Sequence, residues 1–198
     1  MRIPHLLVDM DDVLVDFRSG ACALHSRIRE GIDAACISTG IWRMAGQMGL
    51  SDDEFWKPIN EAGEAFWVGL KKLPWYSVLM EVVLSVADEY HIVTSPSQCP
   101  GSYSGKVKWL NNLYGLGYSN RHLIPTPNKH LFANIPGVVL IDDREETILK
   151  FGAKGGKGIL FPSCGNRLHS LRHNPVQYVV EQILAISKES QCTAASPM

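Results

Sequence analysis

The sequence has almost no net charge and no long hydrophobic run, and each of these shortages excludes a class of protein. Nineteen basic residues stand against 20 acidic residues, and the formal net charge is −1. No broad positive field is therefore present to hold a nucleic acid polymer or an anionic membrane, and a small molecule is the expected partner. The apolar stretches are far shorter than a membrane-spanning helix requires. Asp9 comes before the apolar core of a signal peptide could form, so we expect a cytoplasmic protein.

The sequence is also poor in cysteine, and its cysteines follow no metal-binding pattern. They are odd in number and scattered, without CxxC spacing or a His-rich neighbourhood: Cys22, Cys36, Cys99, Cys164 and Cys192. A zinc site is not expected from such spacing, and most of these residues should be reduced thiols. A chain of 198 residues is long enough for one well-cored domain with a small insertion.

Short apolar runs that end in polar residues alternate with helical patterns along the chain. Strands are expected at residues 3–8, 91–93, 137–141 and 158–161, and helices at residues 78–87, 106–114, 145–151 and 175–186. This alternation predicts an α/β fold with a doubly wound, mostly parallel, Rossmann-like sheet, in which ligands bind beyond the carboxyl ends of the strands. The polar strand ends should therefore meet at one edge of the sheet.

One segment interrupts the alternation and is expected to form a separate part of the molecule. Residues 18–72 contain several helix-like stretches, no convincing strand and five aromatic residues: Trp42, Phe55, Trp56, Phe66 and Trp67. We interpret this segment as a small helical cap inserted into a core domain formed by residues 1–17 and 73–186. Residues 187–198 are small and polar, and we expect them to form a disordered tail.

Acidic residues follow two of the expected strands. Asp9 and Asp11 come after the first strand, and they can face one site because residues i and i+2 of an extended chain point the same way. Asp142 and Asp143 come after a later strand. Crowded carboxylates repel each other and lose hydration, so folding alone gives no reason for this placement. A hard, oxygen-binding ion such as Mg2+ would neutralise all four acids, which we take as its candidate ligands.

This arrangement of acids suits phosphoryl transfer. A carboxylate beside Mg2+ can attack the phosphorus of a bound phosphate monoester and form an aspartyl-phosphate, and Asp9 is the candidate nucleophile. Asp11 would protonate the leaving oxygen and later deprotonate the attacking water. Thr94 and Ser95, at the end of the second strand, are candidate phosphate-binding residues. Lys129 is the expected cation that offsets charge on the phosphoryl oxygens.

Several other residues have two possible roles. Lys106 and Lys108 are alternatives to Lys129, and Arg144 either braces the neighbouring acids or closes a surface ion pair. Phe17 and the cap aromatics could stack on a nucleobase, whose π-face accepts any aromatic partner. Each tryptophan could equally form the core of the cap, whereas Phe17 is a stronger candidate because it follows the acidic turn.

The acidic and hydroxyl-bearing segments together resemble a known set of motifs. DMDDVLVD, VTSPS, Lys129 and LIDDRE are similar, in this order, to the four motifs of the haloacid dehalogenase superfamily of phosphotransferases. Within it the sequence most resembles the 5′(3′)-deoxyribonucleotidase family, which the late segment LFPSCGN also matches. The resemblance spans nearly the whole chain. It implies a haloacid dehalogenase-like fold with a small helical cap, Mg2+ as cofactor, a possible homodimer, and nucleoside monophosphates, mostly pyrimidine deoxyribonucleotides, as substrates.

The resemblance also implies a role for each matching residue. It assigns the nucleophile to Asp9, the acid/base to Asp11, the phosphate-binding hydroxyl to Thr94, the charge-balancing lysine to Lys129, a Mg2+ ligand to Asp142 and a second acid to Asp143. It further implies that the backbone carbonyl of Asp11 binds the metal. Family members often carry Gly where this chain has Asp12, but Asp tolerates left-handed turns better than most residues. The extra charge at this position could shift the affinity for the metal.

The function expected from these residues is a Mg2+-dependent phosphatase for nucleoside monophosphates, a 5′(3′)-deoxyribonucleotidase. The alternative is a phosphatase for sugar phosphates or another small metabolite, because the four motifs do not distinguish one leaving group from another. A dehalogenase has no need of the second acid, Asp11. A non-catalytic, receiver-like domain would usually be shorter and would lack a cap.

Overall fold

The computed structural model describes the backbone of residues 2–194 and the side chains of residues 2–188. Its centre is a sheet of five strands in the order β3-β2-β1-β4-β5, and every neighbouring pair is parallel. The strands are β1 (Ile3–Val8), β2 (Ala87–Thr94), β3 (Leu123–Pro125), β4 (Val138–Asp142) and β5 (Lys157–Leu160). The α/β fold with a parallel sheet expected from the sequence is confirmed.

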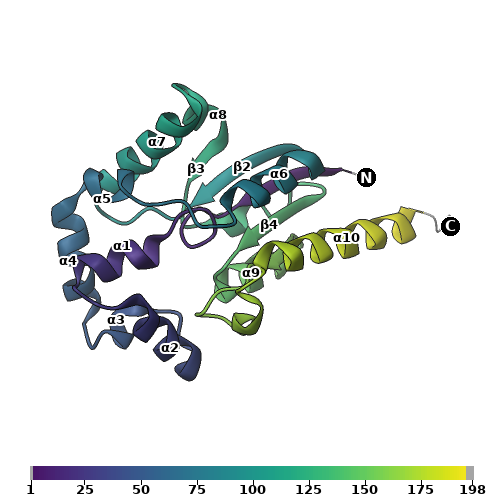
Figure 1. The fold of residues 1–198 in the computed structure, drawn as a ribbon. Coiled ribbons are helices and arrows are strands. Elements are labelled where there is room, and N and C mark those ends of the chain that lie inside the picture. Colours follow the sequence, from purple (N-terminus) through teal and green to yellow (C-terminus); the bar gives the residue numbers. More distant parts are fainter. Residues whose placement is uncertain (1, 195–198) are drawn as a thin grey trace.

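Helices cover both faces of the sheet (Figure 1). The core helices are α6 (Tyr76–Val86), α7 (Pro100–Tyr114), α8 (Tyr118–His122), α9 (Glu145–Gly152) and α10 (Pro175–Ala194), with short 3-10 helices η1 (Lys129–Phe132) and η2 (His169–Leu171). Alternate side chains of β1 serve the two faces, as the period of a strand requires. Leu6 and Val8 join the larger core beneath α6 and α10, whereas Leu7 packs with Phe151 of α9 in a second core.

The segment between β1 and α6 is helical, as expected. It contains α1 (Phe17–Leu24), α2 (Arg29–Thr39), α3 (Met44–Gln47), α4 (Asp52–Ala62) and α5 (Glu64–Val68). Figure 1 shows these helices at the end of the sheet opposite the N-terminus, where the carboxyl ends of the strands lie. The chain enters and leaves the segment side by side, because the Asp16 N–H donates to the Lys71 carbonyl (2.8 Å) and the Leu73 N–H to the Leu14 carbonyl (3.0 Å).

Some elements differ from the expected ones. Strand β3 and helix α8, of 3 and 5 residues, were not expected from the sequence. Helix α10 continues through Ala194, beyond the expected end at residue 186, so the backbone of residues 187–194 is helical where a tail was expected. Residues 195–198 of that tail lie outside the described residues. In the described part of the chain, no helix is both long enough and apolar enough to cross a membrane.

Candidate active site

Three acids meet where β1 and β4 end. Val8 pairs with Ile141 in the sheet, and the Asp9 N–H donates to the Ile141 carbonyl at 2.9 Å, so Asp9 leaves its strand next to Asp142. One carboxylate oxygen from each of Asp9, Asp142 and Asp143 lies within 4.8 Å of the others, and all three residues are buried. The sequence predicts four candidate ligands at this edge of the sheet. The structure brings Asp9, Asp142 and Asp143 together, whereas the Asp11 carboxylate is not part of this cluster among the described residues.

Asp142 and Asp143 hold their protons more strongly than free carboxylates do. Burial, followed by repulsion from Asp9, raises the pKa of Asp142 to about 6. Burial also raises the pKa of Asp143 well above its usual range, with further contributions from Asp12, Asp9 and Asp142. Both shifts have the causes expected of carboxylates crowded together away from water. A cluster of buried oxygen ligands without sulfur or imidazole fits a hard divalent cation such as Mg2+.

Lys129 is the cation within this cluster. It lies in η1 and is 3% exposed, and its Nζ donates to Asp142 Oδ2 at 2.6 Å and also to Asp9 Oδ1. Burial alone lowers the pKa of a lysine, but Asp9 and Asp142 outweigh it and hold the pKa of Lys129 above its usual value. The side chain is therefore a fixed positive charge beside the candidate nucleophile.

Lys106 is a second buried cation in the site. Its side chain, from α7, is 1% exposed, and its Nζ donates to Asp11 Oδ2 and to Thr94 Oγ1 (2.9 Å). The ammonium also lies 4.6 Å from the centre of the Trp67 ring. The sequence offered Lys106 and Lys108 as alternatives to Lys129, but Lys106 and Lys129 serve different acids, and Lys108 pairs with Glu64 at the surface.

The candidate phosphate-binding residues are placed differently from each other. Ser95 lines the cavity above the acids, and its Oγ donates to the Thr126 carbonyl at 3.4 Å. Thr94 is fully buried, and its hydroxyl oxygen accepts a hydrogen bond from Lys106.

The carboxyl group of Asp11 has a raised pKa, and burial is the largest cause of this shift. The Oδ1 atom of Asp11 has no hydrogen-bond partner among the described residues.

Asp12 occupies a left-handed turn directly after the acids. Its φ is 58°, and its Oδ1 accepts a hydrogen bond from the Arg18 backbone N–H at 3.0 Å, at the start of α1. The turn therefore forms without Gly, and the Asp12 carboxylate satisfies one backbone N–H in the first turn of α1, whose N-cap residue is Asp16. Asp12 adds a further carboxylate to the crowded acids, and burial raises its pKa to about 7.

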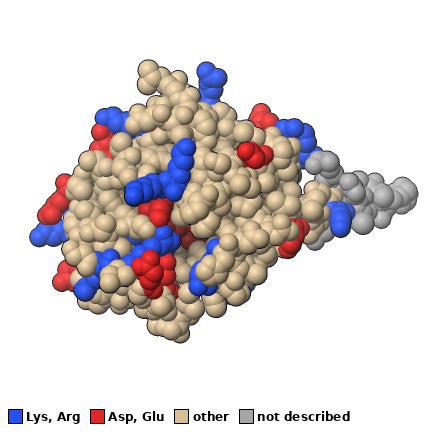
Figure 2. All heavy atoms as spheres, in the orientation of Figure 1, with Lys and Arg blue, Asp and Glu red and all other residues tan. Residues whose placement is uncertain are grey.

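A cavity of about 270 Å³ opens over the acids, and the cap forms its other walls. Asp9, Asp11, Asp12 and Asp143 line its floor, with Lys129 and Ser95 beside them. Its aromatic lining residues are Phe17, Trp42, Phe55, Trp56 and Trp67. On the face drawn in Figure 2, basic and acidic side chains gather around a hollow. The cavity thus joins a charged floor to an aromatic wall.

Most of the aromatic wall is also the core of the cap. Phe17 is 8% exposed, and its ring stacks on Trp67 with centroids 5.7 Å apart. Trp56 lies 5.9 Å from Phe17 and 5.3 Å from Phe55. The two roles expected of these residues, stacking on a base and forming the core of the cap, are therefore compatible, because the same rings pack on each other and line the cavity.

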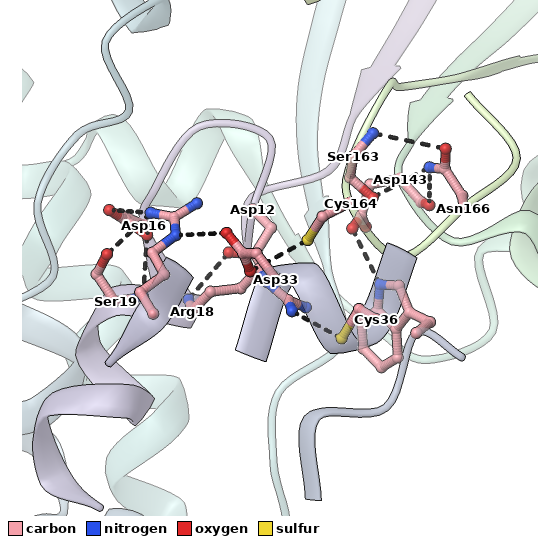
Figure 3. Close-up of polar contacts among 12 residues, drawn as sticks. Asp12, Asp16, Arg18, Ser19, Asp33, Cys36, Asp143, Ser163, Cys164 and Asn166 are labelled. Atoms are coloured by element: carbon pink, nitrogen blue, oxygen red, sulfur yellow. Dashed lines mark hydrogen bonds and ion pairs between the residues drawn. The ribbon is translucent and has the colours of Figure 1, made fainter. Parts of the chain in front are cut away.

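Partly buried ion pairs hold α2 against α1 (Figure 3). Arg18 is 3% exposed, and its Nε donates to Asp33 Oδ1 at 2.8 Å. Arg29 binds the same aspartate through Oδ2 (3.0 Å) and also contacts Asp16. The Cys164 thiol, from the loop after β5, donates to Asp33 Oδ1 at 3.2 Å. Because burial raises the pKa of Cys164 to about 12, its thiol stays protonated as a donor.

The contacts of two residues with Asp143 were not predicted from the sequence. Asn166 Nδ2 donates to the carbonyls of Asp143 and Phe161, both at 2.8 Å, and Trp42 Nε1 donates to Asp143 Oδ2 at 3.0 Å. Asn166 was noted only as part of the LFPSCGN segment. Arg144 combines its two expected roles, because its backbone N–H donates to Asp142 Oδ1 (2.9 Å) and its exposed guanidinium lies 3.9 Å from Glu146.

Comparison with known proteins identifies relatives at the level of family and fold. A family model described as "5' nucleotidase, deoxy (Pyrimidine), cytosolic type C protein" matches residues 2–189. A hydrolase from Pseudomonas syringae superimposes with a TM-score of 0.52 and 18% identity, over 86% of this chain and 89% of that chain. The magnesium-bound structure of YfnB from Bacillus subtilis, described as a HAD-hydrolase, gives 0.51 and 16%, over 81% and 87%. No curated protein matches the sequence. The two structures show the same fold.

Proposed function

The chain belongs to the family of deoxy (pyrimidine) 5′-nucleotidases of cytosolic type C, and from this premise we propose that it hydrolyses nucleoside monophosphates, above all deoxyribonucleotides, through an aspartyl-phosphate on Asp9. Membership of the family makes it a phosphoric monoester hydrolase of the nucleotidase type. The observation that carries the finer proposal is the meeting of three buried carboxylates, within 4.8 Å of one another, beneath a cavity with an aromatic wall.

The residues present fit Mg2+. Asp9, Asp142 and Asp143 would hold the ion through carboxylate oxygens, and the resemblance to the family adds the backbone carbonyl of Asp11. Burial and then repulsion from neighbouring acids raise the pKa values of Asp142 and Asp143. This supports the assignment, because a divalent cation would offset the repulsion. When bound, Mg2+ would neutralise charge on the phosphoryl group and fix its orientation.

The chain's own residues divide the chemistry into two displacements. In the first, the Asp9 carboxylate forms a bond to phosphorus, the ester P–O bond breaks, and Asp11 gives its proton to the leaving oxygen. In the second, Asp11 takes a proton from a water molecule, whose oxygen bonds to phosphorus and releases Asp9 and inorganic phosphate. Lys129, beside Asp9, and Ser95, on the cavity wall, would stabilise the phosphoryl oxygens. Lys106 would hold Asp11 and Thr94 in place.

The cap supplies the recognition of the leaving group. We assign residues 18–72 to the cap and residues 1–17 and 73–186 to the core, since the Val15–Lys72 bridge closes the junction between them. Phe17, on the aromatic wall of the cavity, is the residue that would stack on the base. The family description supports a cytosolic location and a pyrimidine deoxyribonucleotide. The resemblance of the sequence to the deoxyribonucleotidase family supports a homodimer, which light scattering after size-exclusion chromatography would detect.

Hydrolysis of dUMP by the purified protein tests this proposal. We expect phosphate release with Mg2+, loss of activity with EDTA, and a decrease in turnover by several orders of magnitude in Asp9→Asn, because that change removes the nucleophile. Full activity of Asp9→Asn would reassign the nucleophile. A panel of nucleoside monophosphates and sugar phosphates separates the two substrate classes, because the alternative function predicts faster hydrolysis of a sugar phosphate than of any nucleotide.

A further inference from the structure

A tryptophan from the cap is bound to one of the candidate metal ligands. Trp42 lies in the connection between α2 and α3, and its indole Nε1 donates to Asp143 Oδ2 at 3.0 Å. The two residues are 101 positions apart in the sequence. Among the described residues, this is the one hydrogen bond between a cap side chain and the three-acid cluster. An indole N–H can only donate, so the bond specifically favours an oxygen acceptor at this position.

The indole ring of Trp42 packs closely against the core. The Arg144 guanidinium carbon lies 4.9 Å from the ring centre. On another side the ring meets Gly165, where an added Cβ would lie 2.8 Å from Trp42 Cδ1 and 2.9 Å from its Cα. Only a residue without a side chain leaves room for such an approach. Trp42 is therefore held by the core at three points: a carboxylate, a guanidinium and a glycine.

The core segment that contacts the Trp42 ring is itself hydrogen-bonded to Asp143. The Asn166 amide, next to Gly165, donates to the Asp143 carbonyl (2.8 Å), and Figure 3 shows Asn166 and Asp143 side by side. The backbone of Asp143 is thus fixed by the core, whereas its carboxylate is oriented by the cap. In metal sites, hydrogen bonds to a ligating carboxylate orient it, and losing one costs roughly 10- to 100-fold in affinity or activity.

We propose that Trp42 is a positioning residue for metal binding, which links the cap to the metal site through its hydrogen bond to Asp143. The inference rests on the proposed Mg2+ site. The indole N–H orients the Asp143 carboxylate toward Asp9 and Asp142, so the protein binds the ion more tightly than it would without this bond. By linkage, the bound ion strengthens the hydrogen bond to Trp42 to the same extent.

The test compares Mg2+ binding by Trp42→Phe and the wild type, measured by isothermal titration calorimetry without substrate. Phenylalanine keeps an aromatic ring between Arg144 and Gly165 but removes the N–H, so we expect the Mg2+ dissociation constant to rise by about 10-fold or more. Trp109→Phe is the matched control. It also removes an indole hydrogen bond, to the Leu70 carbonyl at 2.8 Å, but away from Asp143, and its dissociation constant should equal that of the wild type.

A second variant disturbs the packing of the Trp42 ring without changing either partner of the hydrogen bond. Gly165→Ala should displace the ring and, like Trp42→Phe, weaken Mg2+ binding. It takes the place of Trp42→Phe if circular dichroism shows that Trp42→Phe does not fold. Wild-type Mg2+ affinity in the folded variants would overturn the inference. Failure of the wild type itself to bind Mg2+ would instead overturn the proposed metal site, so the two failures are distinguishable.

Discussion

The buried lysines give each acid of the site a distinct electrostatic environment. Lys129 contacts Asp9 and Asp142, whereas Lys106 contacts Asp11. Burial raises the pKa of Asp11, and Lys106 is the largest of the influences that lower it. Lys106, which holds the proposed acid/base Asp11, therefore also limits how far the pKa of Asp11 rises. This is a separate task from balancing charge at Asp9, the proposed nucleophile.

Replacement of Lys106 by methionine should impair turnover and change its pH dependence. The variant loses the hydrogen bonds to Asp11 and Thr94, so we expect kcat to fall by roughly 100-fold, within the range attributed to general acid–base catalysis. Removing the cation raises the pKa of Asp11 further. Because Asp11 must be protonated for the first displacement, the basic limb of the kcat/KM profile should move to higher pH. Steady-state kinetics of dUMP hydrolysis between pH 5 and pH 9 measures both effects.

Lys108→Met is the control for this variant. Lys108 is two positions further along α7, is 59% exposed in its side chain and pairs with Glu64 at the surface. Exposed ion pairs contribute little, so its kcat and pH profile should match those of the wild type. A Lys106→Met enzyme with an unchanged pH profile would contradict the role given to Lys106.

At the scale of elements, the attachment of α2 to α1 depends on Asp33. Burial raises the pKa of Asp33, but Arg18 and the hydrogen bonds to the carboxylate outweigh it and hold the pKa below its usual value. A carboxyl group with a lowered folded-state pKa contributes stability above its unfolded pKa, near 3.9, and this contribution is lost as the pH falls through the folded value. The cap should therefore loosen in acid.

Asp33→Asn should destabilise the protein at neutral pH and weaken this dependence on acid. The change leaves the buried Arg18 without its charged partner in α2, so we expect a loss of about 1.5–3 kcal/mol in the free energy of unfolding. Urea unfolding between pH 3 and pH 7 measures it, with Asp52→Asn as the control because the Arg43–Asp52 pair is exposed. If the wild type and Asp33→Asn lose stability in parallel as the pH falls, Asp33 does not carry the effect.

Elements could be predicted from the sequence where the evidence for them is local. An apolar run before acids is enough to predict β1, and a helical period is enough for α9. Strand β3 has only 3 residues, and two of its three side chains are half-buried, so no periodicity marks it. Trp42 and Lys106 bond to residues 101 and 95 positions away. No local pattern predicts which tryptophan of the cap reaches Asp143, because the fold alone brings them together.

The whole molecule concentrates its unfavourable charge at one point. The formal net charge is only −1, yet Asp9, Asp12, Asp142 and Asp143 are all buried together at one edge of the sheet. Lys129 neutralises part of this charge. Burial is the main physical reason for the raised pKa values, and the remaining repulsion adds to it. We therefore expect the stability of the whole chain to depend on the pH and on a divalent cation.

Without Mg2+, the protein should become less stable as the pH rises from about 4 to about 7. Burial raises the pKa of Asp142 to about 6 and that of Asp12 to about 7. A carboxyl group with a raised folded-state pKa contributes stability below its unfolded value, near 3.9, and this contribution is lost as the pH rises through the folded value. Thermal melts in EDTA at constant ionic strength, from pH 4 to pH 8, measure this loss.

Mg2+ should reverse the loss, and its effect on Tm should grow over the same pH range. Each proton that binding displaces strengthens the binding by up to about tenfold per pH unit below the group's pKa. The increase in Tm on adding Mg2+ should therefore be small at pH 5 and large at pH 7.5. In Asp142→Asn, which has no proton to displace at that position, the increase should depend less on pH. An increase in Tm that is equal at all pH values would show that the ion does not compete with these protons, and that it binds elsewhere than on the buried acids.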